Sequence, residues 1–145
     1  MISTIGLSCL STSIFKQQDG ALAQQYIQTT KHRDINIDLG NKIEINAQLT
    51  YPAVGKGPFP GVLLITGSGA EDMNETAGFI RIDNKTGART YPPVPFFQIA
   101  DYLSERGFTV LRYDKTGIGT NHTILDSNIW GNLTLDDLLQ DANKA

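Results

Sequence analysis

The sequence predicts an α/β fold, and three patterns along its 145 residues carry that prediction. An alternating apolar pattern indicates an antiparallel hairpin, two continuously apolar runs indicate buried parallel strands, and an amphipathic helix lies between those runs. A strand, a helix and a second strand in that order form a right-handed crossover between parallel strands. The apolar fraction of 40% and the charged fraction of 19% are typical of a globular chain, and the length suits one domain.

The hairpin is predicted over residues 33–51. Apolar and polar residues alternate on both sides of the pair Gly40-Asn41, which we interpret as the turn. The alternating apolar residues are Ile35, Ile37, Leu39, Ile43, Ile45, Ala47, Leu49 and Tyr51. One face of the hairpin is therefore expected to be buried, and a connector rich in proline and glycine follows it.

The first parallel strand is predicted over residues 62–66, where the run "VLLIT" is apolar without alternation. Such a run suits a strand covered on both faces of its sheet. A polar, glycine-rich loop follows it, and residues 74–95 show no periodic pattern. A loop of that length in a compact domain is usually functional or disordered.

The crossover helix is predicted to start at Pro95 and to end at Gly107. One apolar stripe runs along it, formed by Phe96, Ile99, Ala100 and Leu103. The run "FTVLRY" over residues 108–113 then indicates the second buried strand.

The last predicted helix begins at Thr134, which with Asp137 has the spacing of a capping box. Its apolar face consists of Leu135, Leu138, Leu139 and Ala142. An amphipathic helix in an α/β chain returns the chain to the sheet, so another strand is expected after it. We therefore expect the 145 residues to be a fragment, the N-terminal part of a larger domain.

Charge and composition exclude several classes of partner. The net charge of −3 and the scattered lysines and arginines provide no basic surface for nucleic acid. With one cysteine, Cys9, and two histidines, the chain predicts no cysteine-based or histidine-rich metal site. We expect no cofactor either.

Residues 1–30 are predicted to form a leader, either a signal peptide or a disordered segment. The leader is moderately apolar and contains Ala21-Leu22-Ala23, which is similar to a cleavage site, but it is too short and too rich in Ser and Thr to span a membrane. Four N-x-S/T sequons also favour an exported chain over a cytoplasmic one. They lie at Asn74, Asn84, Asn121 and Asn132.

The stretch "YDKTGIGTN" after the second buried strand raises the hypothesis of phosphoaspartate chemistry at Asp114. An Asp at a strand end followed by Lys-Thr-Gly resembles the phosphorylation site of P-type ATPases. The pattern departs from that site at Ile118, and the downstream aspartates do not follow strands. A dinucleotide site is weaker still, because Gly67-x-Gly69 lacks its third glycine.

Three segments in order resemble the α/β-hydrolase superfamily, in particular esterases and dienelactone-hydrolase-like serine hydrolases. They are "PFPGVLLITGSGAEDMNE", "PFFQIADYLSERGFTVLRYD" and "YDKTGIGTN", and the resemblance covers about residues 35–145. The last segment is similar to the family's Asp-x-Arg-Gly-x-Gly-x-Ser loop. The sequence departs from the family where Thr66 replaces His, Thr116 replaces Arg and Asn121 replaces Ser.

The resemblance implies roles for three groups of residues. The loop Gly67, Ser68 and Gly69 would form part of an oxyanion hole, and Asp114, Gly117 and Gly119 would organise the second loop. The segment 74–95 would cover an acyl pocket, with Phe79, Tyr91 and Phe96 as candidate lining residues. His122 is expected to be exposed to solvent.

The resemblance implies hydrolysis of carboxylic esters, or less readily of peptides, by a serine on a G-x-S-x-G turn. The 145 residues contain no such motif, so we expect this chain to be inactive. A non-catalytic exported module that binds a ligand or partner through residues 74–95 is the alternative. The strand 62–66 is expected to be an exposed apolar edge that favours self-association.

Overall fold

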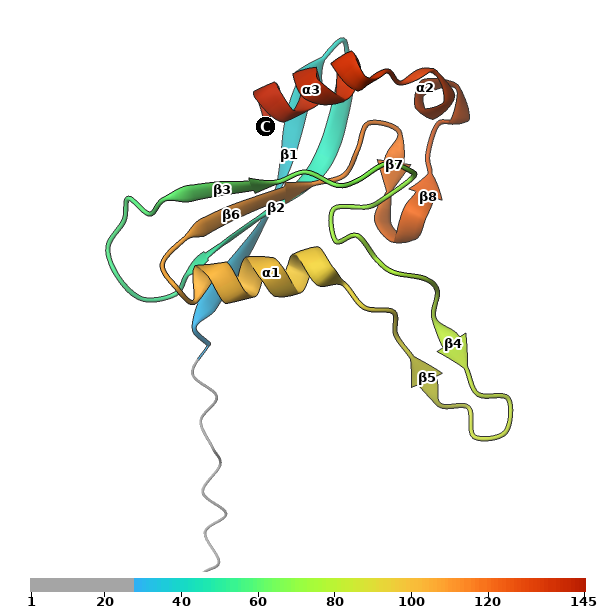
Figure 1. Ribbon diagram of the computed structural model, residues 1–145, viewed down its shortest axis with the longest axis horizontal. Helices are drawn as coiled ribbons and strands as arrows, with labels where there is room; N and C mark the ends of the chain where they lie inside the picture. The colour runs from blue at the N-terminus through green and yellow to red at the C-terminus, as the bar shows by residue number, and fades with distance from the viewer. Residues whose placement is uncertain (1–27) are drawn as a thin grey trace, which may run out of the picture.

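The computed structural model describes residues 28–145 (Figure 1). Nearly all of the predicted leader, including Cys9, lies outside the described residues. The strands are β1 (Thr30–Gly40), β2 (Ile43–Pro52), β3 (Gly61–Leu64), β4 (Arg81–Ile82), β5 (Arg89–Thr90), β6 (Thr109–Tyr113), β7 (Ile118–Gly119) and β8 (Thr123–Ile124). The helices are α1 (Pro95–Ser104), α2 (Ser127–Asn132) and α3 (Leu135–Lys144), and a 3₁₀ turn spans Thr120–His122.

The main sheet is mixed and has four strands in the order β1-β2-β6-β3. β1 and β2 form the predicted antiparallel hairpin, and β2 also pairs antiparallel with β6. β3 and β6 are parallel, and α1 lies between them in the chain. The predicted strand–helix–strand unit is therefore confirmed, and the described residues have an α/β fold.

The turn of the β1–β2 hairpin lies one residue later than predicted. Asn41 and Lys42, not Gly40 and Asn41, are the two residues between the strands, and both have positive φ, 54° and 65°. Two positive φ values are typical of the type I′ turn, whose twist matches that of the strands. Gly40 ends β1 with φ 84° beside a register shift between Asp38 and Gly40. Because of this bulge, Gly40 belongs to β1, although the alternating pattern assigned it to the turn.

The main hydrophobic core lies on the face of the sheet that α3 covers, and it confirms the buried face predicted for the hairpin. Its fully buried members are Leu39, Ile45, Ala47 and Tyr113. Ala142 of α3 packs against them, and Lys144 at the end of α3 donates a hydrogen bond to the Leu39 carbonyl. The predicted capping box at Thr134 and Asp137 is present.

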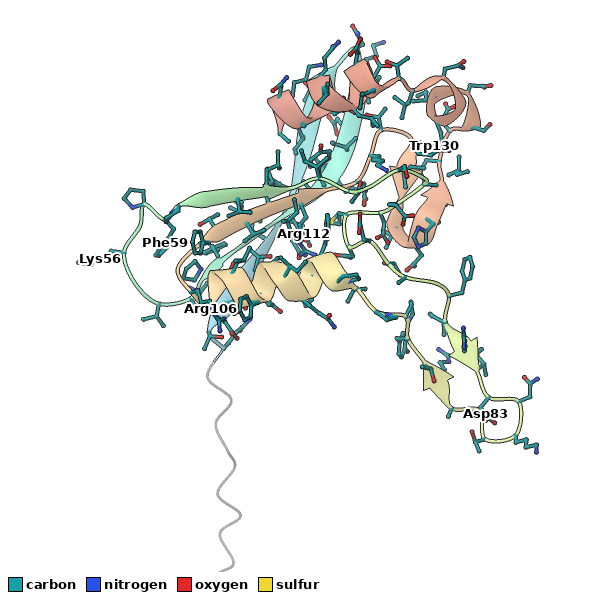
Figure 2. All side chains as sticks on the ribbon, viewed as in Figure 1. Lys56, Phe59, Asp83, Arg106, Arg112 and Trp130 are labelled. Atoms are coloured by element: carbon teal, nitrogen blue, oxygen red, sulfur yellow. The ribbon has the colours of Figure 1, made fainter. Side chains whose placement is uncertain are left out.

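The opposite face of the sheet is covered by α1, as Figure 1 shows. Arg112 of β6 is fully buried there, and it is labelled in Figure 2. Its guanidinium donates hydrogen bonds to the side chains of Asn74 and Gln48 and lies 5.0 Å from the centre of the Phe97 ring. Neutral acceptors and an aromatic face thus surround this charge, and burial lowers the pKa of Arg112 even though nearby aspartates oppose that shift.

β3 is shorter than predicted and less covered. It ends at Leu64, its apolar residues are only half-buried, and Ile65 just beyond it is 52% exposed. Within residues 28–145 the strand pairs with β6 alone. A strand with a neighbour on one side buries less of its surface than an interior strand. The prediction from the apolar run, that both faces of this strand are covered, therefore overestimated its burial.

The segment 74–95 contains a small hairpin that the sequence pattern missed. β4 and β5 pair antiparallel in a short arm that projects away from the main sheet (Figure 1). The Asp83 carboxylate accepts the N–H groups of Lys85 and Thr86 in the turn. Each strand has two residues, which is too short for a detectable alternation.

α2 was not predicted from the sequence either. The Asp126 carboxylate caps this helix by accepting the N–H groups of Asn128 and Ile129. α2 has a single short apolar stretch and a glycine, so periodicity does not reveal it. None of the helices in the described part of the chain has the length and apolar character needed to cross a membrane.

Candidate functional site

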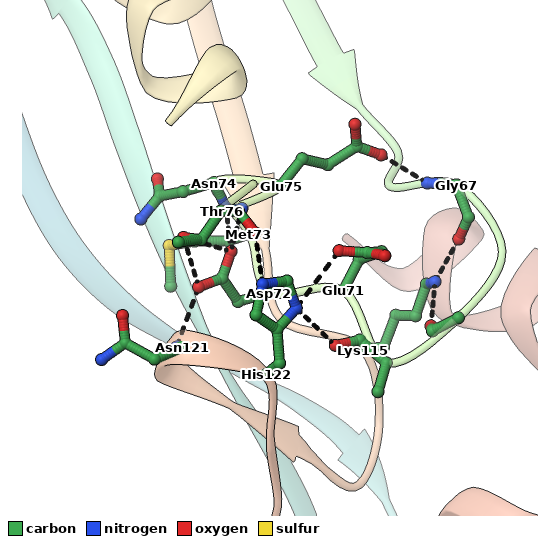
Figure 3. Close-up of polar contacts among 12 residues, drawn as sticks. Gly67, Glu71, Asp72, Met73, Asn74, Glu75, Thr76, Lys115, Asn121 and His122 are labelled. Atoms are coloured by element: carbon green, nitrogen blue, oxygen red, sulfur yellow. Dashed lines mark hydrogen bonds and ion pairs between the residues drawn. The ribbon is translucent and has the colours of Figure 1, made fainter. Parts of the chain in front are cut away.

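Two loops meet beyond the carboxyl ends of the parallel strands β3 and β6. One loop covers residues 65–78 and the other covers residues 114–126. Figure 3 shows the polar contacts that join them. The crevice outside the carboxyl ends of parallel strands is where open α/β sheets usually bind ligands, because loops from neighbouring strands converge there.

Asp72 joins the two loops. Its carboxylate accepts hydrogen bonds from the N–H groups of Asn74 (3.1 Å), Thr76 (3.0 Å) and Asn121 (2.9 Å), and from the Thr76 hydroxyl. Burial alone raises the pKa of Asp72, but these hydrogen bonds outweigh it and lower the pKa overall. Asp72 therefore holds the first loop in a compact turn and fixes it to Asn121, whose φ is 57°.

Asp114 lies behind the loops and does not face solvent. It is 1% exposed, and its carboxylate accepts the Met73 N–H at 2.8 Å and the Asn46 side-chain N–H at 3.4 Å. Burial raises the pKa of Asp114. A nucleophilic aspartate must reach the phosphorus atom of its substrate, so this geometry favours the loop-organising role over phosphoaspartate chemistry.

Gly117 and Gly119 allow close contacts in the second loop. Gly117 has φ 78°, and a Cβ there would lie 3.3 Å from the Asp126 carbonyl oxygen and from the Trp130 nitrogen. A Cβ at Gly119 would lie 3.1 Å from Leu125. The neighbouring Thr116, which stands where the resemblance expects Arg, donates its hydroxyl to Asp141 at 2.7 Å.

The turn Gly67–Gly69 is held from two sides. The Gly67 N–H donates to the Glu75 carboxylate at 2.6 Å, and the Lys115 ammonium donates to the Gly67 carbonyl and, at 2.8 Å, to the Gly69 carbonyl. Lys115 is 3% exposed, and burial lowers its pKa while Glu71 and Glu75 oppose that effect. Among residues 28–145, the Ser68 N–H donates to no protein acceptor.

An open pocket of about 640 Å³ lies over this turn. Backbone and small side chains of the first loop form most of its wall, with two carboxylates from the same loop and the imidazole of His122 from the second loop. The lining residues are Gly67, Ser68, Glu71, Glu75, Thr76, Ala77, Gly78, Phe79, Pro95 and His122. The pocket brings together residues from the loop after β3, from the start of α1 and from the second loop.

Two of the three predicted pocket residues lie together. Phe79, which is 78% exposed, lines this pocket and also a smaller one of about 220 Å³ on the arm, which Tyr91 lines as well. Phe96 lines neither pocket and is half-buried at the start of α1. The missing periodicity of residues 74–95 left the positions of these side chains undetermined.

His122 was expected to be exposed, and that expectation is wrong. Its Nδ1 lies 2.9 Å from the Ala70 carbonyl oxygen and 3.2 Å from a Glu71 carboxylate oxygen, and its Nε2 contacts the Thr76 carbonyl oxygen. Burial lowers the pKa of His122, but these hydrogen bonds and the charges of Glu71 and Asp72 raise it overall. Both ring nitrogens face acceptors, an arrangement that favours the doubly protonated form of the ring.

Four residues of this site were not identified from the sequence as functional: Asp72, Glu75, Lys115 and His122. The spacing Asp72-x-Asn74-x-Thr76 could have indicated a side-chain-capped turn, because Asp often accepts N–H groups two to four residues later. Lys115 and His122 act on a loop far away in the sequence, and Glu75 acts on Gly67, eight residues before it, so no local pattern reveals them. No cluster of His, Cys, Asp and Glu suited to a metal ion occurs among residues 28–145.

Part of the chain is similar to part of a known esterase. No family model matches the sequence. Over 68 residues the chain is 43% identical to Esterase EstD of Thermotoga maritima, and this stretch is 47% of the chain and 13% of that esterase. A solved structure named m3DLH superposes with a TM-score of 0.44 and 17% identity, covering 80% of this chain and 38% of that one. Nearly half of the chain is thus similar to a small part of an esterase.

Proposed function

We propose that residues 31–145 are the N-terminal portion of an α/β-hydrolase domain, and that the whole protein is a serine hydrolase of carboxylic esters. The similarity to an esterase supports the reaction class. The parallel pair β3 and β6, with its crossover helix α1 and two loops at the carboxyl edge, is the arrangement that this fold requires.

The observation that carries the proposal is the Ser68 N–H, which donates to no acceptor among residues 28–145 and belongs to a residue that lines the 640 Å³ pocket. In ester hydrolysis the carbonyl oxygen becomes negatively charged in the tetrahedral intermediate, and a fixed backbone N–H stabilises that charge. One such donor contributes about 3 kcal/mol to the transition state. Gly67 and Gly69 have no side chains to prevent a substrate from approaching Ser68.

The nucleophile and base of such a reaction have no candidates in the described residues. Ser104 is buried, and Ser127 lies at the start of α2. His122 is committed to two carbonyl groups, and His32 contacts Thr50 and Asp101 on the α1 face. No described serine is hydrogen-bonded to a histidine, so the proposal includes inactivity of the 145-residue chain by itself.

The test compares two proteins. The 145-residue chain should neither hydrolyse p-nitrophenyl acetate or butyrate nor gain the mass of a fluorophosphonate adduct. A protein extended by the reading frame that follows codon 145 should do both, with the adduct on a serine in a G-x-S-x-G turn. If the frame encodes no such turn and the extended protein remains inert, the hydrolase proposal is wrong. An adduct on Ser68 of the short chain would also contradict it, with Ser68→Ala as its control.

A second candidate is a non-catalytic module that binds a ligand through the arm. The pocket of about 220 Å³ favours it, because its lining residues flank β4 and β5 and include the exposed side chains of Phe79 and Tyr91. This candidate predicts that the extended protein has no hydrolytic activity. It also predicts that a Phe79→Ala, Tyr91→Ala double variant loses ligand binding. Retained hydrolysis in the extended protein would favour the first candidate.

A further inference from the structure

The ammonium group of Lys115 is buried in an unusual way. Lysine is rarely buried unless a carboxylate pairs with it, because removing the charge from water is costly. Among residues 28–145, no carboxylate lies within ion-pair distance of Lys115. Its ammonium instead donates to the carbonyl oxygens of Gly67 and Gly69, the residues on either side of Ser68, and lies 5.7 Å from the centre of the Trp130 ring.

The position of these carbonyl groups determines the direction of the Ser68 N–H. The Gly67 carbonyl and the Ser68 N–H belong to one planar trans peptide unit, so they point in opposite directions. Lys115 holds the Gly67 carbonyl toward the second loop, and Glu75 holds the Gly67 N–H from the other side (Figure 3). The Ser68 N–H therefore points away from Lys115, and Ser68 itself lines the pocket.

We propose that Lys115 is a positioning residue that keeps the Gly67–Ser68 peptide in one orientation, with the Ser68 N–H directed into the pocket. This inference rests on the proposed function, in which that N–H binds an oxyanion. The positive charge on the carbonyl side also polarises the peptide unit and makes its N–H a stronger donor. Rotation of the peptide would break the hydrogen bonds to Lys115, so the donor is preorganised before a substrate binds.

The orientation is tested first in the wild-type chain by nuclear magnetic resonance. Residual dipolar couplings of the Ser68 N–H, referred to the amides of β2 and β6, should place the vector toward the pocket. In Lys115→Met the coupling should change and the Gly67 carbonyl ¹³C signal should move upfield, because a hydrogen bond is lost. A wild-type vector directed elsewhere, or an unchanged coupling in folded Lys115→Met, would overturn the inference.

A chemical rescue distinguishes the loss of the Lys115 ammonium from a general packing defect caused by the substitution. In a Cys9→Ser background, Lys115→Cys is alkylated with 2-bromoethylamine while unfolded and is then refolded, which restores an ammonium at nearly the original length. Rescue of the coupling and of the carbonyl shift supports the inference, and failure of a folded alkylated protein to recover them contradicts it. Lys56→Met, an exposed lysine on the connector before β3, is the matched control and should change nothing.

Titration with acetate tests the proposed function independently. Acetate should shift the Ser68 amide signal of the wild-type chain, with about tenfold weaker affinity in Lys115→Met. If the couplings behave as expected but acetate leaves the Ser68 amide unchanged, Lys115 orients the peptide and the oxyanion role is wrong. The two failures are thus distinguishable.

Discussion

At the scale of single residues, the site depends on side chains that bind backbone groups. Lys115, Glu75 and Asp72 each bind the backbone of the first loop, and His122 binds two of its carbonyl groups. Loops have few hydrogen bonds of their own, so buried side chains that replace such bonds restrict them to one conformation. The ionisation states of these side chains therefore affect the stability of the loop.

The ionisation of His122 predicts a pH-dependent contribution to stability. A group whose pKa is raised in the folded state stabilises it fully below its unfolded pKa and loses that contribution as the pH rises through the folded pKa. For His122 the loss should begin above its ordinary value of 6.5. Glu71 and Asp72 are the charged groups that face the ring.

Urea unfolding of the wild type and of His122→Gln checks this expectation. The variant should be about 1–2 kcal/mol less stable near pH 6, because the imidazolium makes two hydrogen bonds, and the difference should shrink toward alkaline pH. Ring ¹⁵N spectra should show both nitrogens protonated below the folded pKa. A difference in stability that is constant with pH would contradict this account.

At the scale of elements, sequence periodicity predicted the long segments well and the short ones poorly. The β1–β2 hairpin, α1 and α3 were predicted because each has enough residues for an apolar face to be visible, and β6 was predicted from its continuous apolar run. β4, β5, β7, β8 and α2 were not predicted, since strands of two residues and a six-residue helix are too short to show a period. The hairpin turn was misplaced by one residue because a bulge beside Gly40 absorbs a position.

The hairpin turn predicts opposite effects for two substitutions. Lys42 has φ 65°, which is unfavourable for a residue with a Cβ, so Lys42→Gly should raise the free energy of unfolding by about 0.5–1 kcal/mol. Gly40 has φ 84° and open space around it, so Gly40→Ala should lower that free energy by about 1 kcal/mol through backbone strain alone. Urea midpoints measure both. Lys42→Ala is the control and should have little effect, because it retains the Cβ.

At the scale of the whole molecule, helices cover both faces of the main sheet, but its edge at β3 is unpaired within residues 28–145. α3 and α1 cover the two faces, whereas β3 has no partner on its outer side among residues 28–145. Ile65 is exposed at the end of this strand, and an apolar pocket of about 280 Å³ lies beside it, lined by Val62, Leu63 and Leu111 among others. Unpaired edges with apolar neighbours favour pairing with another chain.

We therefore expect the 145-residue chain to self-associate through β3. Sedimentation velocity should show a mass that increases with concentration. Ile65→Lys should shift the population toward monomer, because it places like charges near each other across the paired edges. Val54→Lys is the matched control, since Val54 is 74% exposed on the connector before β3, and it should leave the association unchanged. A monomeric wild type at all concentrations would refute the expectation.

The sequence by itself determined the class of fold, the hairpin and the strand–helix–strand unit, because these depend on apolar periods and apolar runs that lie within one segment. The loop-organising role that it predicts for Asp114 and the glycines after it stays a prediction. Only the tertiary structure decided how the site is assembled. The contacts of Lys115 with Gly69 and of His122 with Ala70 join residues 46 and 52 positions apart. Such contacts exist because the parallel pairing of β3 and β6 brings the ends of both strands to one edge of the sheet.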